Sequence, residues 1–171
     1  MGNKKYVAYV GTYTHGSSKG IQVYDVDVEN GKLIERSEVK VSNASHTAVS
    51  KNKRFLYSIE DEGVAVFARD ENGDLTRINS VDIDGMRGGF LATDVDGKYL
   101  YVAGYHDGKV TVVHTHRAGR LGSLMDGVFH KGLGSVAERN FRPHVNCVRP
   151  TPDNKYPVSY THLTLPTTSR V

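Results

Sequence analysis

Three stretches of this sequence share one arrangement: an apolar run, a turn that ends in glycine, and a leucine that opens the next run. They read GIQVYDVDVENGKLIERSEV, GVAVFARDENGDLTRINSV and GKVTVVHTHRAGRLGSLMDGV. Their turn glycines, Gly31, Gly73 and Gly119, are 42 and 46 residues apart. A period of about 45 residues that carries four short strands is typical of a β-propeller blade, which buries its faces only against its neighbours. The repeat therefore predicts an all-β chain built from such blades.

The β-branched and aromatic runs between turn residues give the expected strands. In the second repeat they cover 45–50, 54–60, 63–69 and 75–83; in the third, 89–94, 98–104, 108–115 and 121–129. The first repeat has strands only near 6–13, 20–28 and 33–41, so it lacks an innermost strand. We expect a β-propeller fragment of about three and a half blades, with bounds near 4–43, 44–86, 87–131 and 142–156.

Composition narrows the class of protein. The 171 residues are 38% hydrophobic and contain no apolar run long enough to cross a bilayer. The net charge is +3 with both signs interspersed, which argues against a nucleic-acid partner. The N-terminus lacks the features of a secretory signal, and the single Cys147 fits a reducing compartment. We therefore expect a cytoplasmic protein without a membrane partner, and the sequence implies no metal or organic cofactor and no particular oligomeric state.

The last fifteen residues, PVSYTHLTLPTTSRV at 157–171, do not continue the repeat. They contain two prolines and several threonines but no glycine and no blade turn. As protein they predict a weak edge strand or a disordered tail. They also resemble a translated sequencing adapter, so we expect 157–171 to be a non-native tail and leave it out of the functional argument.

Two segments carry a family resemblance. VGTYT followed by SKGI near the start, and FHKGLGSVAERNFRPHVNCVRPTPDNKY at 129–156, resemble the seven-bladed propeller lactonases, the 6-phosphogluconolactonase family that includes a carboxymuconate cycloisomerase. The resemblance covers residues 4 to about 156. Seven blades of about 45 residues need more than about 300 residues, so it implies the N-terminal half of such a protein. We expect half a ring, with two blade faces uncovered, to be inactive or poorly folded.

The resemblance implies a site at the channel mouth. The family has a Pro-His-x-His motif where this sequence has Pro143, His144, Val145 and Asn146, so the second histidine is replaced by Asn146. Opening a lactone needs a general base, donors for the carbonyl oxygen and cations for an anionic substrate. We predict His144 and Glu138 as catalytic residues. The predicted substrate-binding residues are Arg142, Arg139, Asn146, Arg87 and His46.

These predictions have alternatives. Glu138 and Arg139 can form a surface pair, His144 can cap a strand, and His46 can be structural. The predicted function is hydrolysis of a sugar lactone, of the pentose phosphate pathway type in carbohydrate and glucose metabolism. The alternatives are a non-catalytic propeller that binds a ligand, which Asn146 would suit, or a cycloisomerase of a carboxylated muconate, which the arginines would suit. His114 and His116 share one strand face, but no third metal ligand follows them.

Overall fold

The computed structural model describes residues 6–132 and 142–160, and all of its regular elements are strands. The first sheet, of order β1-β2-β3, contains β1 (Tyr6–Gly11), β2 (Gly20–Asp27) and β3 (Lys32–Lys40). The second contains β4 (Thr47–Val49), β5 (Phe55–Glu60), β6 (Gly63–Arg69) and β7 (Leu75–Asp82) in chain order. The third contains β8 (Phe90–Thr93), β9 (Tyr99–Ala103), β10 (Lys109–Thr115) and β11 (Leu121–Phe129), again with sequential neighbours. A last pair joins β12 (Cys147–Pro150) to β13 (Pro157–Tyr160).

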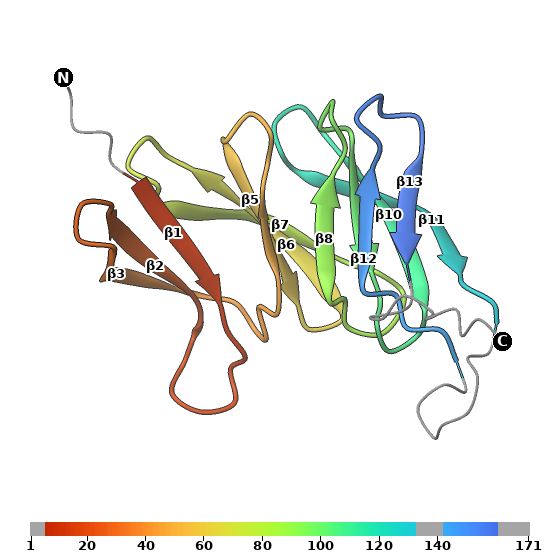
Figure 1. Ribbon diagram of the computed structural model, residues 1–171, viewed down its shortest axis with the longest axis horizontal. Helices are drawn as coiled ribbons and strands as arrows, with labels where there is room; N and C mark the ends of the chain where they lie inside the picture. Colours follow the sequence, from red (N-terminus) through yellow and green to blue (C-terminus); the bar gives the residue numbers. More distant parts are fainter. Residues whose placement is uncertain (1–5, 133–141, 161–171) are drawn as a thin grey trace, which may run out of the picture.

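The sheets are antiparallel and lie side by side in chain order, each turned relative to the one before it (Figure 1). The all-β prediction and the propeller fragment are confirmed, including a first sheet with three strands. The strands begin and end within about two residues of the expected bounds. The β2–β3, β6–β7 and β10–β11 turns each contain a glycine with positive φ, namely Gly31, Gly73 and Gly119, because a side chain there would strain the backbone.

Two apolar clusters join the first three sheets. Because side chains alternate along a strand, Phe55, Tyr57 and Ile59 of β5 face the third sheet and pack against residues such as Leu100 and Val102. Leu56 faces the other way and packs with Ile21, Val41 and Phe67 in the cluster between the first two sheets. The second sheet is therefore covered on both faces.

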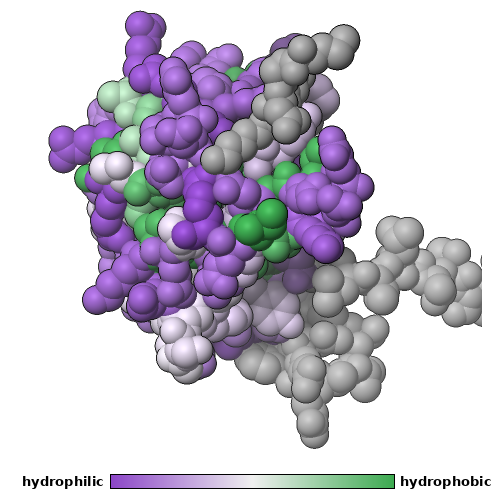
Figure 2. Space-filling model, turned by 90° about the vertical axis from the view of Figure 1, so that its left-hand side faces the viewer, coloured by the Kyte–Doolittle hydropathy of each residue, from purple (hydrophilic) through white to green (hydrophobic). Residues whose placement is uncertain are grey.

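The outer faces are open. Figure 2 views the molecule from the side of the first sheet and shows apolar patches set among hydrophilic side chains. Exposed apolar residues occur on this sheet and on β11 to β13: Val28, Leu33, Ile34, Met125, Val128, Phe129, Val158 and Tyr160. Residues 157–160 form the largely exposed strand β13, and 161–171 lie outside the described residues. No helix in the described part of the chain could span a membrane.

Candidate active site

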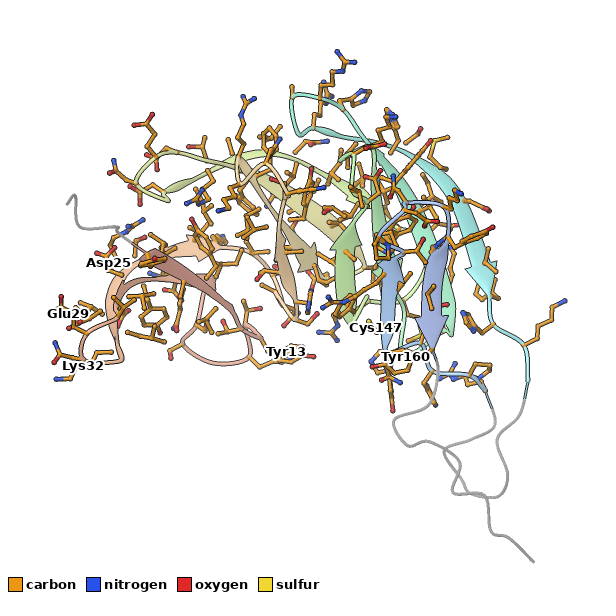
Figure 3. All side chains as sticks on the ribbon, turned by 45° about the horizontal axis from the view of Figure 1, so that its top comes forward. Tyr13, Asp25, Glu29, Lys32, Cys147 and Tyr160 are labelled. Atoms are coloured by element: carbon orange, nitrogen blue, oxygen red, sulfur yellow. The ribbon has the colours of Figure 1, made fainter. Side chains whose placement is uncertain are left out.

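One end of the sheets gathers the segments that the sequence analysis singled out. The end of β1 and the starts of β8 and β12 lie at this end, which is the lower one in Figure 1. Here the β1–β2 loop, the β9–β10 hairpin and the segments before β8 and β12 enclose a hollow of about 240 Å³, which we call the loop-face hollow. Its lining includes Tyr13, Arg87, Tyr105, His106, Val145 and Asn146. In Figure 3, the labelled Tyr13 lies in the β1–β2 loop and the labelled Cys147 at the start of β12.

Two glycines allow these segments to approach. A Cβ on Gly88 would lie 2.5 Å from Val102 Cγ1 and 2.7 Å from Ile59 Cδ1, so only glycine lets the chain before β8 lie on the core. A Cβ on Gly108 would lie 2.7 Å from the Pro143 carbonyl oxygen, and Gly108 also has a positive φ of 66°. Gly108 therefore lets the β9–β10 hairpin pack against the segment that carries His144.

A buried lysine and an aspartate hold the loop that carries Arg87. Lys109 is 5% exposed, and its Nζ donates to the carbonyl oxygens of Ile83 and Asp84 at 3.3 and 2.5 Å. Asp107 accepts a hydrogen bond from the Met86 amide at 3.0 Å. The hairpin that presents Tyr105 is thus fixed to the loop that presents Arg87.

Arg87 supplies positive charge to the hollow. Its guanidinium carbon lies 5.3 Å from the centre of the Tyr13 ring, within the range of a cation–π contact. Its Nη1 is buried and makes no hydrogen bond with any residue that the structure describes. A buried donor without an acceptor is costly. Because Arg87 also lines the hollow, its guanidinium is a candidate to hold a carboxylate or phosphate group.

His144 lies beside the hollow and is oriented by Tyr105. The imidazole stacks on the Tyr105 ring with centroids 4.4 Å apart and an interplanar angle of 19°. The His144 Nδ1 lies 2.7 Å from the Tyr105 carbonyl oxygen. Because a carbonyl only accepts hydrogen bonds, Nδ1 carries the proton, and in the neutral ring Nε2 has the lone pair. The imidazole can therefore act as a base through Nε2.

Asn146 lines the same hollow, two residues further on. Its Nδ2 donates to the His144 carbonyl oxygen at 3.1 Å, which fixes the amide relative to the chain that carries the imidazole. An amide has no titratable proton, so Asn146 can orient a substrate by hydrogen bonds but cannot carry out the proton transfer available to a histidine.

His46 lies elsewhere. It faces a different hollow of about 450 Å³ between β4 and β8, which also includes Arg149. Its Nδ1 accepts the Leu91 amide hydrogen bond at 3.2 Å, and its ring centre is 4.5 Å from that of Phe90. Burial, and secondarily the charge of Arg149, lower the pKa of His46. The structure therefore gives His46 a packing role next to the inner strands, and substrate contact by this residue stays a prediction.

The remaining predicted residues belong to the segment before β12. Arg142 is exposed and lies two residues before His144. Glu138 and Arg139 lie outside the described residues, so their roles stay predictions. Tyr13 and Tyr105 also line the hollow, although neither is among the site residues predicted from the sequence. Gly108, in the same hairpin as Tyr105, was the available sign that another segment packs closely there.

The comparisons with known proteins agree with this architecture. The family described as lactonase, 7-bladed beta-propeller, matches residues 7–161. The 6-phosphogluconolactonase of Bacillus subtilis is 37% identical over 161 residues, which are 91% of this chain and 46% of that protein. An uncharacterized protein of Staphylococcus saprophyticus is 31% identical over 88% of this chain and 45% of its own length.

Solved structures give the same result. The periplasmic gluconolactonase of Pseudomonas aeruginosa superposes with a TM-score of 0.85 at 27% identity, over 91% of this chain and 47% of that one. A candidate 6-phosphogluconolactonase from Bacteroides fragilis superposes with a TM-score of 0.84 at 35% identity, over 91% and 45%. The chain therefore spans about half the length of these relatives. With the family match covering nearly all of the described strands, the chain belongs to the seven-bladed β-propeller lactonase family.

Proposed function

We propose that this chain forms the N-terminal blades of a lactone hydrolase that opens a sugar lactone, of the 6-phosphogluconolactonase type. The observation that carries the proposal is the pairing at the loop-face hollow of a buried Arg87 Nη1 that lacks an acceptor with an imidazole whose Nδ1 is bonded to the Tyr105 carbonyl. Family membership and the names of the Bacillus subtilis and Pseudomonas aeruginosa proteins support the reaction class.

In the proposed reaction, Nε2 of His144 takes a proton from a water molecule as that water attacks the lactone carbonyl carbon. The ring carbon–oxygen bond then breaks and the leaving oxygen is protonated, which gives the open hydroxy acid. Arg87 holds an anionic group of the substrate, and Arg142 and Arg139 add positive charge from the segment before β12. Asn146 donates a hydrogen bond to the substrate. Glu138 is proposed as a second proton-transfer group.

The direct test is turnover of 6-phosphogluconolactone and of unphosphorylated gluconolactone by the protein that carries this sequence. His144→Ala is expected to lower kcat/KM by about 10²-fold to 10⁴-fold, the usual contribution of a general base. Arg87→Gln is expected to raise KM about tenfold for the phosphorylated lactone, with a smaller effect on kcat. The control is His116→Ala, because His116 lies in the β10–β11 hairpin, away from the loop-face hollow.

Each other outcome has a definite meaning. Equal rates for His144→Ala and the parent protein would remove His144 from the mechanism. No turnover of any lactone would favour a propeller that binds without catalysis, which Asn146 in place of the second histidine of the family motif would suit. A direct assay with a carboxylated muconate tests the cycloisomerase alternative, because the fold does not distinguish the two reactions.

We also propose a cytoplasmic location and a small-molecule lactone as the partner. The Pseudomonas aeruginosa relative is described as periplasmic, so family membership alone does not decide the compartment. Fractionation of cells that express the protein, with the lactonase assay applied to each fraction, tests this proposal.

A further inference from the structure

A hollow larger than the loop-face hollow lies at the opposite end of the sheets. It has a volume of about 590 Å³ and is lined by the β4–β5 loop, the β8–β9 loop and the β10–β11 hairpin, which lie at the upper end in Figure 1. We call it the inter-blade hollow. Both sheets that form it, β4 to β7 and β8 to β11, have four strands. Its walls therefore come from complete blades and do not depend on any chain beyond them.

The rim of this hollow is positively charged. Lys51, Lys98 and Arg117, one from each of the three connections, line it, and all three are exposed. The opposing carboxylate in the lining is Asp96, whose Oδ2 lies 3.5 Å from Lys98 Nζ. The buried Asp94 adds a second negative charge near Tyr57 in the floor. The rim itself still has three exposed cations against one carboxylate, which favours an anionic ligand there.

The floor contains residues with hydroxyl groups and two aromatic rings. Four residues with hydroxyl groups, Ser50, Tyr57, Thr93 and Thr115, belong to the lining beside Phe55. Thr115 Oγ1 donates to the Gly97 carbonyl oxygen at 2.7 Å, and Thr115 also shares a hydrogen bond with the Tyr57 side chain. Burial raises the pKa of Tyr57 to about 12, so this hydroxyl stays protonated at neutral pH. A floor of this kind suits a ligand that has hydroxyl groups of its own.

We propose that the inter-blade hollow is a binding site for a small phosphorylated polyol, with the phosphate at the rim cations and the polyol hydroxyls over the floor. The site is on the face opposite the loop-face hollow, so it is separate from the proposed lactonase reaction and does not depend on it. A ligand with only a phosphate would contact the rim alone, and a ligand with only hydroxyl groups would contact the floor alone. Either ligand should therefore bind more weakly than the phosphorylated polyol.

Calorimetric titration of the purified protein with glycerol 3-phosphate tests this proposal, with glycerol and inorganic phosphate as separate probes. Arg117→Gln is expected to raise the Kd for glycerol 3-phosphate about fivefold to tenfold, as loss of a charge-assisted contact would. Arg120→Gln is the matched control. Arg120 is an exposed arginine of the same hairpin but lines a neighbouring hollow, so the Arg120→Gln variant has the same net charge as Arg117→Gln. The Kd of Arg120→Gln for glycerol 3-phosphate is expected to stay within about twofold of the parent value.

Two further variants test the floor and the location. Tyr57→Phe keeps the shape of the floor but removes one hydroxyl, so it should weaken glycerol 3-phosphate and leave inorganic phosphate unchanged. Arg87→Gln, at the loop-face hollow, should leave both affinities unchanged. The proposal is overturned if glycerol 3-phosphate does not bind, if Arg117→Gln and Arg120→Gln have equal effects, or if Arg87→Gln removes the binding and so places it at the other hollow.

Discussion

Strands β1 and β5 are equivalent in the repeat and similarly apolar in sequence, yet they are buried very differently. The sequence YVAYVG of β1 leaves Tyr6 49% and Val10 38% exposed, whereas Phe55 to Ile59 of β5 are all buried. β5 lies between β4 and β6 within a sheet that has neighbours on both faces, whereas β1, among the strands of 6–132 and 142–160, pairs only with β2. The difference shows that in this fold a strand is buried by its neighbours, and that its own hydrophobicity only permits burial.

The largest expected effect compares one residue from each strand. Ile59→Ala on β5 removes a fully buried side chain from the cluster between the second and third sheets and should cost about 2–5 kcal/mol of unfolding free energy. Val10→Ala on β1 removes a partly exposed side chain and should cost less than about 1 kcal/mol. Urea unfolding of both variants measures the difference. Equal costs would contradict the conclusion that neighbouring blades determine the stability of each strand.

The second test uses the tyrosine at the centre of β5. Burial, followed by the charge of Asp94, raises the pKa of Tyr57 to about 12 from its ordinary value of 10. Above pH 10 the unfolded chain loses the phenol proton while the folded protein keeps it, so stability should fall as the pH rises from 10 to 12. The loss attributable to Tyr57 is about 2–3 kcal/mol. It should be absent in Tyr57→Phe.

Tyr9 on β1 is present in both the parent protein and Tyr57→Phe, so its titration cancels in their difference. Burial also raises the pKa of Tyr9, but Arg69 Nε donates to the Tyr9 hydroxyl at 3.0 Å and opposes that shift. Unfolding free energies of the parent protein and Tyr57→Phe, measured at pH 9 and pH 12, give the contribution of Tyr57 by difference. If the two proteins lose equal stability, the Tyr57 hydroxyl ionises as it would in water.

The third test concerns His46, which directly precedes β4, the inner strand that has no counterpart in the first sheet. Burial lowers the pKa of His46, so on acidification the unfolded chain takes up a proton at a higher pH than the folded protein. Stability should therefore fall as the pH drops below about 6.5. Protonation of Nδ1 also removes the acceptor of the Leu91 amide, a hydrogen bond that contributes about 1 kcal/mol.

The matched variant is His46→Gln, which can keep an acceptor for the Leu91 amide but has no titratable proton. The difference between the parent protein and this variant, measured at pH 7.5 and pH 5.5, isolates His46 from the other acidic and histidine groups. A difference that does not change with pH would contradict a buried, neutral His46.

Much of the fold was predictable from the sequence because short local patterns, the turn glycines and the apolar runs, define the repeat. The turn glycines Gly31, Gly73 and Gly119 have the positive φ that their turns require, and the apolar runs between them form the expected strands. The three-stranded first sheet was also predictable, because the first repeat has only three strand-like runs, near 6–13, 20–28 and 33–41.

The candidate site was only partly predictable. His144, Asn146 and Arg87 come from motif position and blade spacing, and the structure places Arg87 and Asn146 at one hollow with His144 beside it. The contribution of Tyr105 was missed because it depends on a backbone carbonyl and on ring stacking across 39 residues. Contacts of this kind depend on how two loops pack, which residue types and periodicity do not encode.

The smallest expected effect concerns a polar contact between the first two sheets. Arg36 on β3 pairs with Asp25 at 3.0 Å and, across the interface, with Asp74 at 2.7 Å, and it donates to the Asn72 carbonyl oxygen at 2.9 Å. Its Nε is buried and makes no hydrogen bond within the described residues, which offsets part of the gain. Arg36→Gln should therefore cost only about 0.5–1 kcal/mol.

The control for Arg36 is Arg77→Gln, which breaks the pair with Glu60 inside the second sheet. Both effects should shrink in 1 M NaCl, because the charges at these positions are partly open to solvent. Urea unfolding with and without salt gives the comparison. If Arg36→Gln costs as much as Ile59→Ala, the first sheet is held to the second mainly by this polar contact, and the apolar cluster around Ile21 and Leu56 contributes less than its burial indicates.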